Sequence, residues 1–130
     1  EIRIEQDSGA VIKTKNLYVD QSDGQKYYRT SEPTVYVSEG STINAYKGMD
    51  LDMNKNYMQL LGKVEILQNS GSKIVSHDLI VDQSNGGEIY KSNHRTNYQT
   101  KTTNITAQSL YYDAKTQIIE LLGGVTGLYE

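Results

Sequence analysis

The sequence predicts an all-β fold, an antiparallel β-jellyroll in which a taco-like folded sandwich, open at both edges, is built from four hairpin repeats of about 31 residues. A fixed period is the first observation: isoleucines recur every 31 residues, at positions 12, 43, 74 and 105. The second is an aspartate at positions 20, 52, 82 and 113, followed ten residues later by a small residue, which is Thr30, Gly62, Ser92 or Gly123. The third is the shortness of the connections, because segments of four or five residues join antiparallel neighbours and exclude βαβ crossovers.

The first repeat follows a short edge segment at 2–5 and a turn at 7–9. Its β-forming residues predict an outgoing strand over 11–20. Asp23 and Gly24 predict a hairpin turn, because both residue types tolerate a positive φ angle. The returning strand covers 27–37. Pro33 lies inside it and predicts a bend, because proline cannot donate a ladder hydrogen bond.

The other repeats follow the same plan. In the second, strands over 42–52 and 57–67 flank a turn at 54–56, and one extra residue near Gly48 predicts a bulge. In the third, strands over 73–82 and 88–100 flank a turn at 85–87, and the returning strand is unusually polar. The fourth begins at 102 and closes with a strand over 118–129. Small residues in the middle of these strands predict that each strand folds over there, so that two layers enclose one interior.

Alternation along the strands predicts which side chains face this interior. The aliphatic and small residues of the inward parity are Ile12, Ile43, Ala45, Leu60, Val64, Ile66, Ile74, Ile105, Ala107, Leu121 and Val125. Val35 and Val37 join them if the bend at Pro33 shifts the register by one residue. Such an interior is compatible with two structures, a filled sandwich core and a groove that stays open to an apolar ligand.

The aromatic residues are eleven tyrosines, with no phenylalanine or tryptophan. A tyrosine has an apolar ring and a polar tip, so the sequence predicts half-wet surfaces for them rather than a dry core.

Composition and motifs exclude several function classes. The net charge of −3, without a basic face, argues against nucleic acid as a partner. The absence of cysteine removes thiolate metal sites and thiol nucleophiles. His77 and His94 fall at unrelated points of the repeat, and the aspartate-rich turns fit hairpin turns better than calcium loops. Without a nucleophile elbow, phosphate loop or paired carboxylates, the sequence predicts no enzyme, metal or cofactor.

The segment from Ile43 to Ile66, which closes with Leu60-x-Gly62-x-Val64-x-Ile66, resembles the LptC family of lipopolysaccharide-transport proteins. The proline-bent strand over 27–37 and the closing segment over 124–129 are similar to strands of the same family. Together these motifs cover about residues 10–129. The third repeat departs from the pattern, because Ser92 stands where a glycine is expected.

The resemblance implies a single periplasmic domain over residues 1–130, of the LptA/LptC/OstA-like β-jellyroll superfamily. It further implies an N-terminal helix, outside this sequence, that anchors the domain in the inner membrane. The implied function is to bind lipopolysaccharide in an aliphatic β groove and to relay it to a periplasmic LptA bridge during outer-membrane biogenesis. The implied groove residues are Ile12, Tyr28, Val35, Val37, Ile43, Ala45, Leu60, Val64, Ile66, Ile74, Ile105, Ala107, Leu121 and Val125.

The resemblance also implies that the unpaired edges of the sheet bind partners. The N-terminal edge would face an inner-membrane ABC transporter of the LptB2FG-like type. The C-terminal edge would meet an LptA-like protein through Ile118, Glu120, Leu122, Val125 and Leu128. Three alternatives stay open: an LptA-like bridge protein, which shares the repeat, a structural β-repeat scaffold with a filled interior, and a carbohydrate-active or sugar-binding β-solenoid in which exposed tyrosines stack on sugars.

Overall fold

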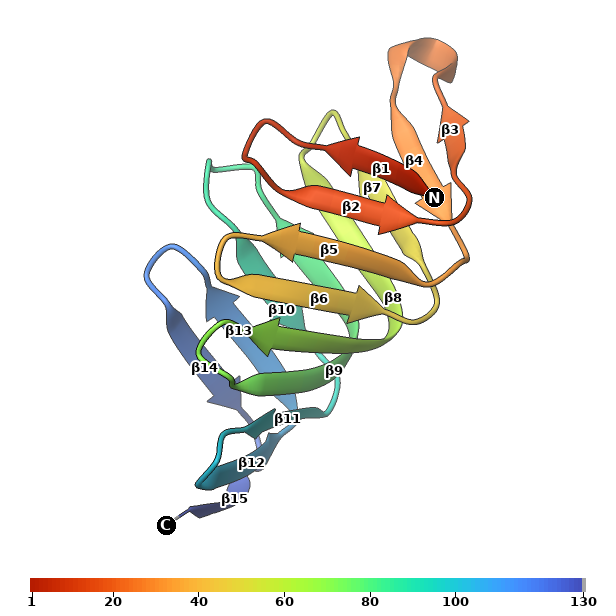
Figure 1. Cartoon of the computed structure of the whole chain (residues 1–130). Helices are drawn as coiled ribbons and strands as arrows, with labels where there is room; N and C mark the ends of the chain where they lie inside the picture. Colours follow the sequence, from red (N-terminus) through yellow and green to blue (C-terminus); the bar gives the residue numbers. More distant parts are fainter. Residues whose placement is uncertain (130) are drawn as a thin grey trace.

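A computed structural model describes residues 1–129, and these residues form one antiparallel sheet of fifteen strands that folds over on itself (Figure 1). The predicted all-β fold is confirmed. In chain order the strands are β1 (Ile2–Glu5), β2 (Val11–Thr14), β3 (Tyr18–Asp20), β4 (Tyr27–Thr30), β5 (Thr34–Ser38), β6 (Ser41–Ala45), β7 (Met49–Asp52), β8 (Tyr57–Gln68), β9 (Lys73–Asp82), β10 (Ile89–Ser92), β11 (Thr96–Gln99), β12 (Thr103–Ala107), β13 (Ser109–Asp113), β14 (Ile118–Leu122) and β15 (Thr126–Tyr129).

The sheet has two layers, which we call front and back. The front layer runs in the order β1, β2, β5, β6, β8, β9, β11, β12 and β15. The back layer runs in the order β3, β4, β7, β8, β9, β10, β13 and β14. The long strands β8 and β9 belong to both, and their pairing is interrupted by a register shift between Leu60 and Lys63. The two chain ends lie at opposite ends of this stack (Figure 1).

The two long sides of the sandwich differ. Along one side, which we call the crease, the chain passes from one layer to the other, as it does after Thr14, Thr30, Ala45 and Ala107. Along the other side, which we call the mouth, the strands of each layer are joined by tight hairpins. The long strands of the predicted repeats therefore do fold over near their middles. The predicted strand over 118–129, for example, is divided into β14 in the back layer and β15 in the front layer.

The crease uses two kinds of residue. In the second repeat Gly48 has a φ of +103°, and a Cβ atom built on it would lie 1.9 Å from the carbonyl oxygen of Thr30. In the third repeat buried hydroxyls take over: the Ser92 hydroxyl donates to the carbonyl oxygen of His77 (2.7 Å), and the Ser76 and Thr96 hydroxyls bond to each other (2.8 Å). These side-chain bonds satisfy polar groups at the bend, so the third repeat needs no glycine there.

The aspartates of the repeat each organise the hairpin that follows them at the mouth. In every case the Oδ1 atom accepts a backbone N–H two residues on, at 3.0 Å, from Ser22, Asn54, Ser84 and Lys115. This bond is the one by which aspartate stabilises a turn, and it explains the period seen in the sequence. Asp23 (φ 56°) and Gly24 (φ 73°), within the short 3-10 turn Ser22–Gly24, adopt the positive φ angles predicted for them.

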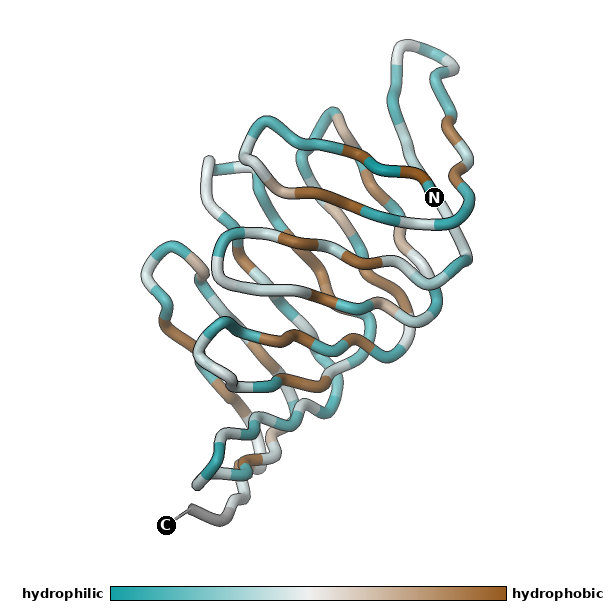
Figure 2. Tube along the Cα trace, in the orientation of Figure 1, coloured by the Kyte–Doolittle hydropathy of each residue, from teal (hydrophilic) through white to brown (hydrophobic). Residues whose placement is uncertain are grey.

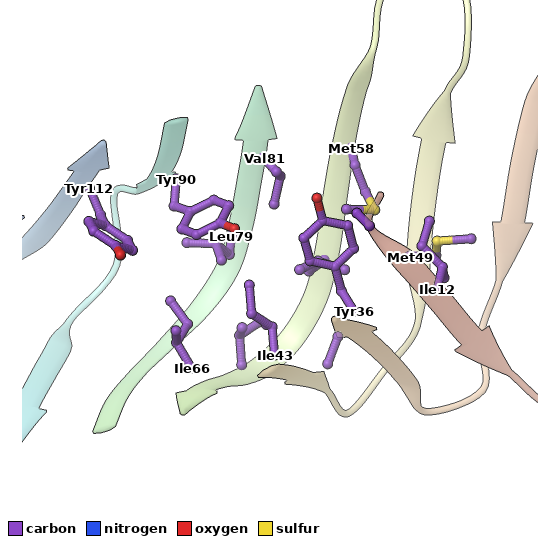
Figure 3. Close-up of a cluster of buried hydrophobic side chains, with 14 of the residues drawn as sticks. Ile12, Tyr36, Ile43, Met49, Met58, Ile66, Leu79, Val81, Tyr90 and Tyr112 are labelled. Carbon is purple, nitrogen blue, oxygen red and sulfur yellow. The ribbon is translucent and has the colours of Figure 1, made fainter. Parts of the chain in front are cut away.

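The interior is built from side chains that face one another across neighbouring strands. In the front layer, cross-strand partners form one inward row of Ile4, Ile12, Tyr36, Ile43, Ile66, Ile74, Tyr98 and Ile105. In the back layer the matching row is Tyr28, Leu51, Met58, Val81, Tyr90, Tyr112 and Ile119. Figure 2 shows the hydrophobic stretches along the strands and the hydrophilic hairpin tips. The central members of both rows form one buried cluster (Figure 3).

Pro33 breaks the returning strand of the first repeat between β4 and β5, as predicted, but it does not shift the register as proposed. Tyr36 is fully buried and pairs with Ile12 and Ile43. Val35 and Val37 therefore face outward, and their predicted inward orientation is wrong.

Candidate binding groove

A groove of about 1080 Å³ lies along the mouth, between the hairpin tips of the two layers. The front layer lines it with the β1–β2 and β5–β6 turns, which contribute Gln6, Ala10 and Glu39. The back layer lines it with the β7–β8, β9–β10 and β13–β14 turns, which contribute Met53, Gln83, Glu88 and Ala114. The lining is mostly polar and charged, with Ala10, Met53 and Ala114 as its apolar side chains.

Beneath this groove the interior is filled by the chain's own side chains. Tyr36 and Tyr90 have no solvent-exposed surface, and the rings of Tyr90 and Tyr112 pack at a centroid distance of 5.3 Å. Figure 3 shows these tyrosines between the aliphatic side chains of both layers. The prediction that tyrosines avoid a dry core is therefore wrong for Tyr36, Tyr90 and Tyr112, whose rings lie in the core. The hydroxyls of Tyr36 and Tyr90 reach polar side chains at the mouth.

Six polar residues join the two layers across the mouth, and we call them the mouth cluster: Gln6, Tyr36, Ser38, Gln83, Glu88 and Tyr90. The Tyr36 hydroxyl donates to a carboxylate oxygen of Glu88. The Gln83 amide nitrogen donates to the Tyr36 hydroxyl (2.8 Å) and to Gln6 Oε1 (3.3 Å). The Ser38 and Tyr90 hydroxyls bond to each other (3.2 Å). Each of these bonds links a front-layer segment to the back-layer hairpin β9–β10.

The electrostatics of the mouth cluster keep its phenols neutral. Burial and, next, the negative charge of Glu88 raise the pKa of Tyr36 far above its ordinary value. Burial likewise raises the pKa of Tyr90. Both hydroxyls therefore stay protonated, and can donate hydrogen bonds, at pH values where a free tyrosine is ionised.

Both ends of the stack present free strand edges. Within residues 1–129, β1 and β3 have a neighbour on one side only at the N-terminal end, as do β14 and β15 at the C-terminal end. The inward rows are less covered at these ends, where Ile4, Tyr28, Ile119 and Leu121 are only partly buried against the core. The apolar interior thus reaches solvent at both ends of the molecule.

Comparison with known families decides the identity. Residues 41–130 match the family described as "Lipopolysaccharide-assembly, LptC-related", and this segment is 90 of the 130 residues. The chain belongs to the LptC-related family. No curated protein matches the sequence.

Membership assigns this LptC-related chain a role in lipopolysaccharide transport. The family is one of transport and binding proteins rather than enzymes, and its members are periplasmic and anchored at the inner membrane. In the described range, residues 1–129, no helix has the length and apolar character to cross a membrane.

Most side chains predicted to face the interior of the LptC-related domain do so. The fully buried ones are Ile12, Ile43, Ala45, Leu60, Val64, Ile66, Ile74 and Ala107. Tyr28 and Ile105 belong to the inward rows, and Leu121 faces inward beside the buried Leu110. All three are only partly buried, because they lie near the ends of the stack. Whether any of these residues contacts a lipid stays a prediction.

Three predicted groove residues of this LptC-related chain do not face the interior. Val35 and Val37 lie on the outer face of the front layer, for the reason given above. Val125 is 51% exposed in the connection between β14 and β15, because Gly123 and Gly124 turn the chain there. Of the predicted partner edge, Ile118, Glu120 and Leu122 are exposed on β14. The backbone of Leu128 pairs with Asn104, and its side chain lies outside the described part of the structure.

The sequence-based prediction missed most of the back layer's half of the interior, from which it included Tyr28, Leu60 and Leu121. Leu51, Met58, Leu79, Val81 and Tyr112 are buried there, and each lies two residues from another buried residue of the same strand. Leu60 was predicted to face inward, and continuing the same alternation along β8 toward the mouth would have identified Met58 as well. The mouth cluster carried no such signal, because its members are polar and come from segments far apart in the sequence.

The outer face of the back layer also carries tyrosines in the LptC-related chain. Tyr27 and Tyr57 lie in one cross-strand ladder, where they alternate with Asp52 and Asp82. They therefore do not form the continuous aromatic platform that a sugar-binding function would favour.

Proposed function

We propose that this domain binds the acyl chains of lipopolysaccharide between its two layers and passes the lipid along its length, from an inner-membrane ABC transporter at the β1/β3 end to an LptA-like periplasmic protein at the β14/β15 end. The observation that carries the proposal is the pair of facing inward rows, which run from Ile4 and Tyr28 to Ile105 and Ile119 and are partly uncovered at both ends. In this proposal the domain acts in the periplasm and is held at the inner membrane by a preceding helix.

The chemistry of the rows suits this task. Each acyl methylene shielded from water contributes roughly 0.8 kcal/mol, so an apolar channel holds lipid without a specific polar bond. Apolar walls offer many similar weak contacts, and a chain can exchange one set for the next at little cost. The sugars of the lipid would stay in the polar groove at the mouth, outside the apolar rows.

Site-specific photo-crosslinking tests the lipid-binding part. A photoreactive residue at Ile66 or Ala107, both buried inward, should label added lipopolysaccharide. The same residue at Val37, on the outer face of the same layer, is the matched control and should label little. Equal labelling at all three positions, or labelling at Val37 alone, would refute binding between the layers.

The relay part is tested at the free edge of the back layer. Ile118 and Leu122, 57% and 48% exposed on β14, should lose binding to an LptA-like protein when both are replaced by lysine, because charge on an edge strand opposes strand addition. Leu67→Lys, at a 41% exposed position on the central strand β8, is the control. Unchanged co-elution of the edge variant on size-exclusion chromatography would count against this edge.

One observation favours a second function, that of a structural repeat scaffold that assembles through its edges. The centre of both rows is completely buried by the protein itself, as a filled sandwich core would be. The scaffold predicts edge-dependent assembly without any lipid label at Ile66 or Ala107, so the two experiments above separate it from lipid transport.

A further inference from the structure

The mouth and the crease join the two layers by different means. At the crease the chain itself connects them, with a glycine or a hydroxyl at each bend. At the mouth the connection is the mouth cluster, made of side-chain hydrogen bonds between residues 47, 52 and 77 positions apart. Only the mouth can therefore open without breaking backbone geometry.

The rings beneath the mouth cluster occupy the space that an acyl chain would need. Tyr36 extends from the front layer and Tyr90 from the back layer, and both rings are fully buried in the centre of the inward rows. Their hydroxyls hold the rings in place through Glu88, Gln83 and Ser38. A lipid tail cannot lie between the central strands until these two rings move.

We propose that the mouth cluster is a latch, and that its opening lets the Tyr36 and Tyr90 rings turn out of the interior so that an acyl chain enters sideways from the mouth groove. The inference rests on the proposed function, because it concerns how the same interior accepts its lipid. Opening of the latch is reversible, because each hydrogen bond that the mouth cluster loses can be replaced by one to water or to the hydroxyl groups of the lipid headgroup.

Removing one hydroxyl from the latch gives the first test. Tyr36→Phe keeps the buried ring and deletes the bonds to Glu88 and Gln83. The rate at which the protein takes up lipid A with a fluorescent acyl chain should rise at least five- to tenfold, because the loss of one hydrogen bond of ordinary strength changes a rate by roughly that factor and this variant loses two. Glu88→Gln is the second variant and should act in the same direction, since Glu88 lies in a turn and outside the aliphatic rows.

The matched control makes the same chemical change away from the mouth. Tyr46→Phe deletes a hydroxyl that bonds to Glu65 at an exposed position beside the crease. Its uptake rate should equal that of the unmodified protein. Acceleration by Tyr46→Phe equal to that by Tyr36→Phe would mean that general loosening of the fold, rather than the latch, sets the rate, and would overturn the inference.

Holding the latch closed gives the opposite test. The chain has no cysteine, so Gln6→Cys combined with Gln83→Cys can be bridged across the mouth by a bifunctional, reducible thiol reagent. The bridged protein should take up the fluorescent lipid A at least tenfold more slowly, and reduction should restore the rate. The control pair, Thr42→Cys with Leu67→Cys, joins cross-strand partners of the front layer only and should leave uptake unchanged.

The outcomes distinguish the latch from the proposed function. If the bridged protein takes up lipid at the unbridged rate, the lipid enters through the ends of the stack, which overturns the latch while lipid binding stands. If the unmodified protein takes up no lipid and gives no photo-crosslink at Ile66, the proposed function fails and the latch fails with it.

Discussion

Gly48 lies directly against the backbone of Thr30, so closely that a Cβ atom on Gly48 would be 1.9 Å from the Thr30 carbonyl oxygen. The two residues belong to different repeats, and their approach is where the second repeat bends around the first. Gly48→Ala should lower the free energy of unfolding by about 3 kcal/mol or more, because it adds both an unfavourable φ angle and a collision with backbone.

Gly9→Ala is the control for that prediction. Gly9 has a similar φ of +93°, but no atom lies within 4 Å of the position of its Cβ. Gly9→Ala should lower the free energy of unfolding by about 1 kcal/mol, because only the unfavourable backbone conformation contributes. Urea denaturation of both variants measures the difference, and equal costs would contradict the close approach at the crease.

The register of β5 gives a second prediction. Tyr36→Ala should destabilise the protein by about 3–5 kcal/mol, because it empties a fully buried site in the inward row. Val35→Ala, at the adjacent outward position, should cost less than about 1 kcal/mol. The reverse order in thermal or urea unfolding would mean that Pro33 shifts the register after all.

The aspartates of the repeat give a third prediction. Asp52→Ala removes the acceptor of the Asn54 and Lys55 backbone N–H groups and should cost about 1 kcal/mol. Asp52→Asn, which keeps an acceptor oxygen, should recover much of this loss. Asp50→Ala, which breaks the exposed pair with Arg29, should change stability by less than about 0.5 kcal/mol. Equal effects at positions 50 and 52 would show that the turn bond does not explain the repeat.

The buried phenols give a pH prediction. A tyrosine in the unfolded chain ionises near pH 10, whereas Tyr36 and Tyr90 have raised pKa values in the fold and stay neutral to higher pH. Their contribution to stability is therefore fully present below about pH 10 and is lost as the pH rises further. Above that pH the Tyr36→Phe variant should lose stability less steeply, by about 1.4 kcal/mol per pH unit, in urea denaturation between about pH 9 and 11.5. Parallel curves for the two proteins would contradict the buried, neutral state of Tyr36.

The repeat was readable from the sequence because its signals are local and periodic. Ile12, Ile43 and Ile74 all lie in one inward row, and the aspartates all organise their turns. The small residue ten positions after each aspartate marks the crease, whether it is Gly62 or Ser92. The resemblance to the LptC family, stated on the motifs of the second repeat, is confirmed by the family match over residues 41–130.

The errors come from features that a local pattern does not encode. The residues around Pro33 do not reveal whether the inward parity of the strand changes by one residue at the bend. Because valine and tyrosine are both good strand formers, the residue types do not show which of them faces inward. Tyr36 is buried because Glu88 and Gln83, about fifty residues away, satisfy its hydroxyl. The mouth cluster is a product of the folded topology, which brings three hairpins together, and its polar residues resemble any other turn residues in the sequence.

Among the strands of residues 1–129, β8 and β9 are the two that pass through both layers, and they pair with each other on both sides of the bend. They form the spine of the molecule, while the strands at either end are held by a neighbour on one side only. Amide hydrogen exchange should therefore be slowest in this pair and fastest toward the two ends. An edge strand can thus detach and join another protein while the centre keeps its shape, so docking at the ends need not unfold the domain.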